Sequence, residues 1–164
     1  MIRLTPHYTQ ALLISLLLVV VFAFDIHLSA GIDRSTWRCL VYQCCHVNVF
    51  HLLANLYCIW VILMSNFRTG IRRWLYAYLL SCIFVLISLP TEGASGIVFA
   101  LLGMMSWQSA HISKYHGYTL LAIAIGLLFP RNLNVLLHLL CYISGIIIEM
   151  PYTQWRRALR TYWR

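Results

Sequence analysis

Long apolar runs without charge constrain this chain more than any other feature. Residues 11–24 contain only apolar side chains apart from Ser15, and none of them is charged. About 20 such residues are enough to cross a bilayer as a helix. Over the 164 residues, 62% are hydrophobic and 10% charged, against about 45–50% and about 25% in soluble domains. We therefore interpret the chain as an integral membrane protein, which excludes disordered, coiled-coil, collagen-like and disulfide-stapled classes.

Six segments meet or approach the length of a membrane span. Within a bilayer every backbone polar group needs an internal partner, so these segments are predicted to be helices. The expected fold is an all-α, polytopic bundle of six transmembrane helices. No internal repeat or Gly/Ser linker divides the chain, which predicts a single domain over 1–164, with a core at about 10–150 and a tail at 151–164. The expected spans are 10–30, 46–65, 72–89, 95–110, 117–130 and 133–150.

The basic residues predict the orientation. With six spans both termini share one side, and nine Lys and Arg residues fall on that side against three opposite, so we expect both termini in the cytoplasm. A cleavable signal peptide at the first span is an alternative that leaves every other loop on the same side. Asp25 and His27 favour a retained span because they suit a cleavage region poorly. The nine are Arg3, Arg68, Arg72, Arg73, Lys114, Arg156, Arg157, Arg160 and Arg164, and the three are Arg34, Arg38 and Arg131.

The net charge of +8 is interpreted as topological, because most basic residues flank apolar runs. The tail 151–164 mixes arginine with tryptophan and tyrosine, which favours anchoring at the lipid headgroups over nucleic-acid binding. Six cysteines include no CxxC pair, so no zinc ribbon or thioredoxin-like motif is present. Cys82 and Cys141 lie in apolar stretches, where a thiol usually acts as a small hydrophobe.

Polar residues inside spans are costly and are functional candidates. They occur in three places: His46, His51 and Asn55 in the second span, the Gly-Ala-Ser-Gly segment at 93–96, and His138 in the sixth. No His-Glu-x-x-His motif is present, and two histidines five residues apart point about 140° apart on a helix, which excludes a zincin site. No pair of intramembrane aspartates and no nucleotide-binding loop occurs, so neither an aspartyl protease nor a nucleotide-dependent enzyme is indicated.

The remaining groups suit nucleophilic catalysis. His51 and Asn55 are four residues apart and share one helix face, so they can aim two hydrogen bonds at one point, as an oxyanion hole requires. Ser95 lies between small residues at a helix start, where free backbone N–H groups favour developing negative charge. The predicted topology places these residues and His138 in the outer leaflet, within about 10 Å of one level.

The His-x4-His-x3-Asn pattern, the Gly-x-Ser-Gly motif and His138, with Trp37 and Arg38 upstream and Gly145 seven residues after His138, resemble the rhomboid family of intramembrane serine proteases over about residues 10–150. The resemblance implies a dyad with Ser95 as nucleophile and His138 as general base, with no cofactor and no metal. It assigns the oxyanion donors to the Ser95 N–H and to His51 and Asn55. Supporting roles fall to Gly93, Gly96, Phe99, whose ring packs on the catalytic histidine in the family, and His46, expected to be structural.

Two positions depart from the family pattern. Cys141 stands where a glycine usually follows the catalytic histidine, and residues 65–68 replace a Glu-containing motif. The expected substrates are single-span transmembrane proteins, cut within the bilayer of what we expect to be a bacterial inner membrane. The alternatives are a catalytically inactive rhomboid-like protein that binds transmembrane clients, and a small transporter using the histidines, which intramembrane carboxylates or an inverted repeat would favour.

Overall fold

The structure is a computed structural model that describes residues 6–65, 70–128 and 134–162, with the backbone alone at Pro6 and 151–162. This part of the chain forms six α-helices joined by loops and short 3-10 turns, with no strand longer than one antiparallel bridge between Ala30 and Thr91. The all-α prediction is confirmed. The helices are α1 Pro6–Ala23, α2 Val49–Met64, α3 Ile71–Val85, α4 Ser95–Met105, α5 Ile112–Ile125 and α6 Val135–Tyr162; the 3-10 turns are η1 Thr36–Leu40, η2 Tyr42–Cys44, η3 Ser106–Gln108 and η4 Gly126–Leu128.

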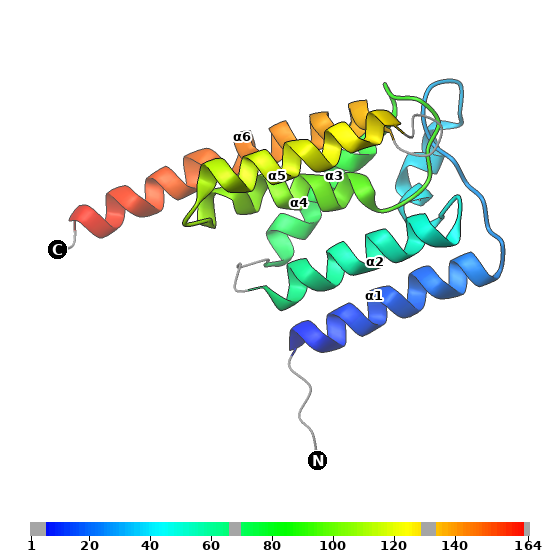
Figure 1. Cartoon of the computed structure of the whole chain (residues 1–164), viewed down its shortest axis with the longest axis horizontal. Helices are drawn as coiled ribbons and strands as arrows, with labels where there is room; N and C mark the ends of the chain where they lie inside the picture. Colours follow the sequence, from blue (N-terminus) through cyan, green and yellow to red (C-terminus); the bar gives the residue numbers. More distant parts are fainter. Residues whose placement is uncertain (1–5, 66–69, 129–133, 163–164) are drawn as a thin grey trace, which may run out of the picture.

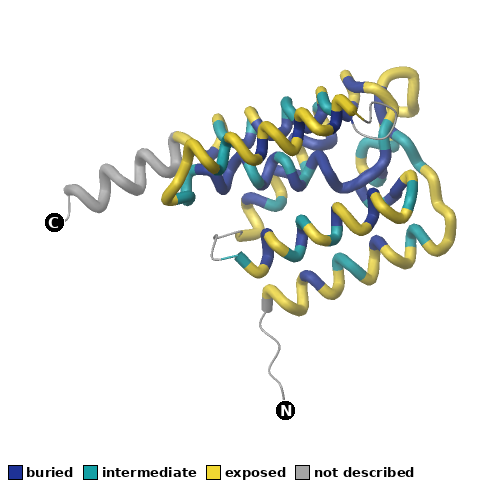
Figure 2. The backbone as a smooth tube through the Cα atoms, viewed as in Figure 1, coloured by how far each residue is buried: buried dark blue, intermediate teal, exposed yellow. Residues whose placement is uncertain are grey.

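Helix α4 is the centre of the bundle. It packs against α6 and α3, whereas α1 packs mainly against α2 at one edge (Figure 1). Most residues of α4 are buried, and Figure 2 shows the buried backbone in the middle of the bundle, between outer helices that are largely exposed. A central, apolar α4 explains why the sequence of this helix shows no polar face.

The helix boundaries differ from the expected spans in three helices. Helix α1 ends at Ala23, before Asp25 adopts a left-handed φ of 54°. Helix α4 stops at Met105 and continues as the η3 turn, so it covers less than the expected 95–110. Helix α6 is longer than expected and continues into the tail to Tyr162. Residues 154–160 include alanine, leucine, arginine and glutamine, which favour helix, so the backbone extends past the apolar segment.

Two glycines allow α4 and α6 to approach closely. A Cβ atom at Gly103 would collide with the backbone carbonyl of Tyr142, and one at Gly145 would collide with that of Ala100. Side chains at these two positions are therefore incompatible with the observed contact. Cys141 lies on the same helix and is fully buried. The cysteine in place of the family glycine is accommodated within the core.

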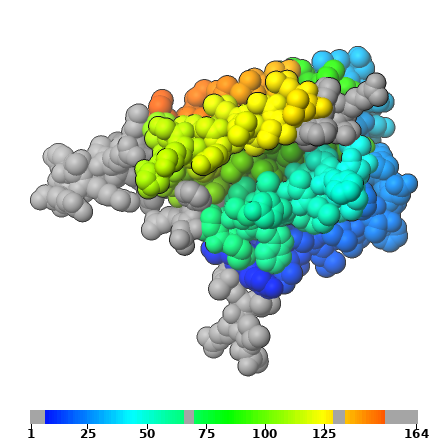
Figure 3. Space-filling model, viewed as in Figure 1, coloured from blue at the N-terminus to red at the C-terminus, as the bar shows by residue number. Residues whose placement is uncertain are grey.

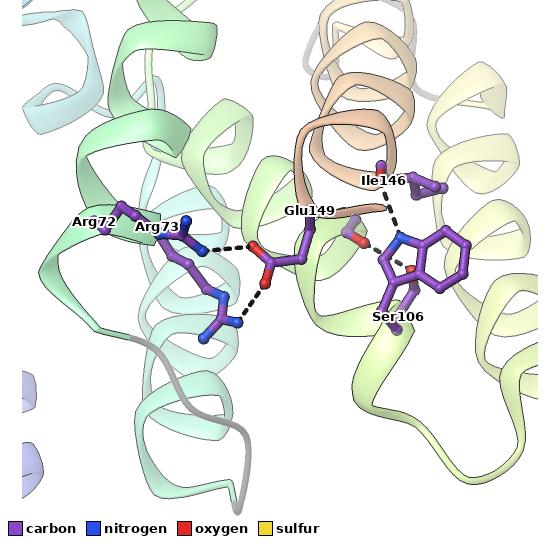
Figure 4. Close-up of polar contacts among 7 residues, drawn as sticks. Arg72, Arg73, Ser106, Ile146 and Glu149 are labelled. Atoms are coloured by element: carbon purple, nitrogen blue, oxygen red, sulfur yellow. Dashed lines mark hydrogen bonds and ion pairs between the residues drawn. The ribbon is translucent and has the colours of Figure 1, made fainter. Parts of the chain in front are cut away.

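A buried ion pair joins α3 to α6 at the opposite end of the bundle from residue 95. Arg73 donates to Glu149 at 2.5 Å, and Arg72 contributes a second contact at 3.4 Å (Figure 4). Glu149 is 1% exposed, so its charge is balanced by the two guanidinium groups. Trp107 donates to the carbonyl of Ile146 nearby, at 3.0 Å. These contacts fix the middle of α6 against α3 and η3.

Large apolar side chains cover much of the outer surface. Phe50 on α2 is 80% exposed, Tyr118 on α5 is 72% exposed, and α1 exposes several leucines; α2 and α5 both lie on the face shown in Figure 3. Among the described residues, no single helix meets the combined length and hydropathy expected of a membrane-crossing segment. Several of the basic residues that predict the orientation lie outside the described side chains: Arg3, Arg68, Arg131, Arg156, Arg157, Arg160 and Arg164. Residues 66–68, part of the segment that departs from the family pattern, also lie outside the described residues.

Candidate active site

Ser95 is the first residue of the central helix. The preceding turn brings it there: Gly93 has a φ of 116° and donates its N–H to the carbonyl of Tyr42 at 3.0 Å. A residue with a Cβ rarely adopts this φ, so glycine is required for the turn. Because the first four N–H groups of a helix lack partners within it, the backbone around Ser95 offers hydrogen-bond donors.

His138 lies against Ser95, although the two residues come from different helices. Nε2 of His138 is 2.8 Å from Oγ of Ser95, and the residues are 3% and 8% exposed. Asn134 fixes the start of α6 by accepting the N–H of Leu137 at 3.1 Å and donating to the carbonyl of Leu89 at 2.8 Å. His138 follows one turn later, so this cap positions the imidazole at the depth of Ser95.

Phe99 completes the environment of the imidazole. It follows Ser95 by one turn of α4, and its ring stacks on that of His138 with centroids 4.4 Å apart and planes 27° apart. Ser95 and Phe99 therefore contact the same imidazole from one helix. The serine contacts its ring nitrogen and the phenylalanine contacts its face.

His51 and Asn55 lie on the face of α2 that meets the turn before Ser95. Their side chains approach Gly93 so closely that a Cβ there would be 2.5 Å from Cε1 of His51 and 3.3 Å from Nδ2 of Asn55. Asn55 also donates to the carbonyl of His51 at 3.0 Å. Among the described residues neither ring nitrogen of His51 has a hydrogen-bond partner. Buried polar groups usually have partners, so an unpaired imidazole beside the serine has donor capacity available to a ligand.

His46 lies next to His51, and among the described residues it makes no hydrogen bond to Ser95. Its ring meets the His51 ring edge to face, with centroids 5.4 Å apart, and it is 1% exposed. His46 therefore contacts the candidate site through His51.

Gly96 packs against a pair of residues that the sequence analysis did not single out. The hydroxyl of Tyr42 and Oγ of Ser81 are 2.5 Å apart, and Tyr42 also donates to the Ser81 carbonyl at 3.2 Å. A Cβ at Gly96 would collide with Oγ of Ser81. Ser81 is a polar residue within an expected span, so the cost of intramembrane polar groups was the signal that could have identified it.

A second group missed by the sequence analysis supports the turn from outside. His27 contacts Glu92 at 2.8 Å and Asp25 at 3.1 Å. The hydrogen bond to Glu92, followed by that to Asp25, raises the pKa of His27. Glu92 is buried and directly precedes Gly93. The loop after α1 is thereby connected to the segment that presents Ser95.

The geometry thus combines a buried Ser–His contact, a ring that orients the histidine, and two side chains directed at the adjacent turn. A family model for the Rhomboid domain matches residues 33–155. The chain belongs to the rhomboid family. No curated protein matches the sequence. The rhomboid match includes every candidate site residue and begins after α1.

Rhomboid proteins are integral membrane proteins, which assigns this chain to a membrane. The family consists generally of serine proteases and also includes inactive members. Within the described parts of this rhomboid chain, no group of three or more His, Cys, Asp or Glu side chains could hold a metal ion.

Proposed function

We propose that this rhomboid family member is an intramembrane serine endopeptidase that hydrolyses peptide bonds in or near transmembrane segments. The observation that carries the proposal is the 2.8 Å contact between Oγ of Ser95 and Nε2 of His138. A nucleophile and its base within hydrogen-bond distance, with the base oriented by a third group, are the signature of covalent catalysis. Here the third group is the ring of Phe99.

In the proposed reaction, His138 takes the hydroxyl proton as Oγ of Ser95 attacks the substrate carbonyl. The proton then passes to the leaving amine, and the acyl-enzyme is released by water. Negative charge develops on the carbonyl oxygen during attack. The backbone N–H of Ser95, the unpaired ring of His51 and the amide of Asn55 are the donors proposed to stabilise this charge.

The proposed setting is a six-helix transmembrane bundle with both termini in the cytoplasm of a bacterial cell. The apolar outer surface of several helices supports this arrangement, because exposed apolar area of this extent is unfavourable in water. In this orientation Ser95 begins a helix that runs inward from the outer face. Water must then reach Ser95 through a cavity open to that face, since hydrolysis consumes it.

The proposed substrates are single-span proteins whose outer ends unwind readily, because a protease needs extended backbone and a stable helix hides it. Replacing small or helix-breaking residues near the cleavage site by leucine should slow cleavage. Unchanged cleavage rates across such a series would contradict this part of the proposal.

The test is cleavage of a single-span reporter by the purified full chain in liposomes. Ser95→Ala and His138→Ala should reduce cleavage to background. Ser106→Ala is the matched control, because Ser106 is also a buried serine but lies just past the opposite end of α4, where its hydroxyl donates to the Gly103 carbonyl. Circular dichroism and thermal unfolding of each variant verify that loss of cleavage is not loss of folding.

A serine-directed covalent probe gives an independent readout. It should label the parent and the Ser106→Ala variant and leave Ser95→Ala unlabelled. If the folded parent neither cleaves several reporters nor reacts with the probe, the protease proposal is wrong and the inactive, client-binding function replaces it. Binding of the same reporters without cleavage would then be the expected result.

A further inference from the structure

We propose that Cys39 and Cys82 are a redox-active pair that forms a disulfide between the η1 loop and helix α3, with a low-molecular-weight or protein disulfide as oxidant. Cys39 belongs to η1 and Cys82 to the last turn of α3, 43 residues later along the chain. The inference does not depend on the proposed peptidase activity.

The two cysteines are already in contact. The Cys82 thiol donates to the backbone carbonyl of Cys39 at 3.0 Å. Given bond lengths of about 1.5 Å and about 1.2 Å along Cα–C=O, Cα of Cys39 lies within about 6 Å of the Cys82 sulfur. A disulfide also needs the two Cα atoms about 4.4–6.8 Å apart, so bond formation requires rotation of the Cys39 side chain and whatever approach of η1 to α3 this separation demands.

Gln43 holds this arrangement from the next turn. Its side-chain amide donates both to the Cys39 carbonyl at 3.0 Å and to the Cys82 sulfur at 3.2 Å. Tyr78, one turn before Cys82 on α3, donates to the carbonyl of Leu40 at 2.9 Å. The η1 loop and α3 are therefore held together by several polar contacts around the two thiols, independently of a covalent bond.

Exposure gives the order of the reaction. Cys39 is half-buried and Cys82 is 6% exposed, so the oxidant reaches Cys39 first. The Cys39 thiolate attacks one sulfur of the oxidant and releases the other as a thiol. The Cys82 thiolate then attacks the Cys39 sulfur and releases the second oxidant sulfur as a thiol. Two protein thiols are oxidised and one oxidant disulfide is reduced, so electrons and protons balance.

The proposed topology places this pair on the outer side. Helix α3 runs outward and Cys82 lies near its end, while η1 follows α1 on the same side. That side is an oxidising compartment in the proposed bacterial setting, where disulfides persist. The bond would fix the loop that carries Trp37 and Arg38 to the helix whose Ser81 contacts Tyr42.

The test uses the purified full chain, reduced, freed of reductant and then exposed to oxidised glutathione. Free thiols are blocked with a maleimide, and peptides are mapped by mass spectrometry without reduction. The expected result is a cross-linked peptide containing Cys39 and Cys82, and a Tm several degrees above that of the reduced protein. Cys39→Ser and Cys82→Ser should abolish the cross-link. Cys58→Ser, a half-buried cysteine on α2, is the matched control and should retain it.

Three results would overturn the inference. They are maleimide labelling of both thiols in the oxidised, folded parent, a glutathione adduct on Cys39 that Cys82 does not resolve, and a cross-link between Cys82 and a different cysteine. Because the parent protein gives each result, the test remains decisive even if a serine variant fails to fold. A cross-link with no rise in Tm would contradict the proposed stabilisation of the loop.

Discussion

Phe99 of α4 and His138 of α6 stack face to face, with their ring centroids 4.4 Å apart, beside Ser95 at the start of α4. The imidazole is therefore held by an aromatic face on one side and by a hydroxyl at its ring nitrogen. In the proposed reaction the stacking restricts the orientation of the imidazole that receives the serine proton.

Phe99→Ala should lower kcat of reporter cleavage about 10- to 100-fold, because small displacements of a catalytic group are costly to rate. KM should change little, since the ring contacts the proposed base and has no proposed role in substrate binding. Phe50→Ala, at an exposed phenylalanine on α2, serves as the control and should keep the parent kcat. A higher KM with an unchanged kcat would argue against an orienting role for Phe99.

Gly93→Ala should reduce cleavage about 100-fold or more, the effect expected for loss of an oxyanion donor. The new methyl group would lie 2.5 Å from Cε1 of His51. The alanine would also have to adopt a φ of 116°, which residues with a Cβ rarely do. Gly70→Ala tests the specificity of this effect, because Gly70 has a φ of −66° and open space around it. Near-parent cleavage by a folded Gly93→Ala variant would contradict the placement of His51 beside the serine.

Gly103→Ala and Gly145→Ala should each lower the free energy of unfolding by about 1–3 kcal/mol, the usual cost of overpacking. Each methyl would collide with a backbone carbonyl of the facing helix. Gly117→Ala should instead stabilise by about 0.5–1 kcal/mol, because Gly117 lies within α5 and a Cβ added there would have open space around it. Denaturant unfolding in micelles measures the free energy of unfolding of all three variants. If Gly103→Ala and Gly145→Ala changed it no more than Gly117→Ala, the close packing of α4 on α6 would be contradicted.

Glu149→Gln should lower the free energy of unfolding by about 3–5 kcal/mol, because it removes the negative charge that faces the buried guanidinium of Arg73. Arg72→Ala removes only the longer contact of a side chain that is 43% exposed. Its cost should be about 1 kcal/mol or less. The difference in the free energy of unfolding between the two variants, measured by thermal or denaturant unfolding, checks the prediction. A larger loss of stability for Arg72→Ala than for Glu149→Gln would contradict it.

The contacts of His27 predict a pH dependence of stability. Because Glu92 and Asp25 raise the pKa of His27 above its usual 6.5, the folded state binds its proton more tightly than the unfolded state. The stabilisation is complete below about pH 6.5 and is lost as the pH rises through the folded-state pKa. The Tm of the parent should therefore exceed that of His27→Gln most between about pH 5 and pH 6, below the usual pKa of histidine. A Tm difference that stays constant up to about pH 9 would exclude this ion pair as its cause.

Part of the candidate site could be predicted from single residues. Ser95, His138, His51 and Asn55 are polar groups in apolar segments, and the cost of such groups makes each of them visible in a sequence. Their periodicity on helices indicated which could share a face. The His-x4-His-x3-Asn and Gly-x-Ser-Gly patterns added the family resemblance, and the family match agrees with it.

The contacts of the long segment between α1 and α2 could not be predicted in this way. His27 with Glu92, Tyr42 with Ser81, and Cys39 with Cys82 each join that segment to α3 or to the turn after it. Their partners are 39 to 65 residues apart, and a non-helical path carries no periodicity that would place one against the other. The apolar neighbours of Cys82 in the sequence predict a small hydrophobic side chain and give no sign of Cys39 beside it.

The all-α class and the family could be predicted from the sequence, which also indicated the candidate catalytic residues, because apolar runs and costly intramembrane polar groups are local properties. Three features emerged only from the folded structure: where the helices end, the extension of α6 to Tyr162, and which loop residues support the turn at Gly93. Those outcomes depend on packing between segments distant along the chain, and only the folded arrangement brings their atoms within contact range.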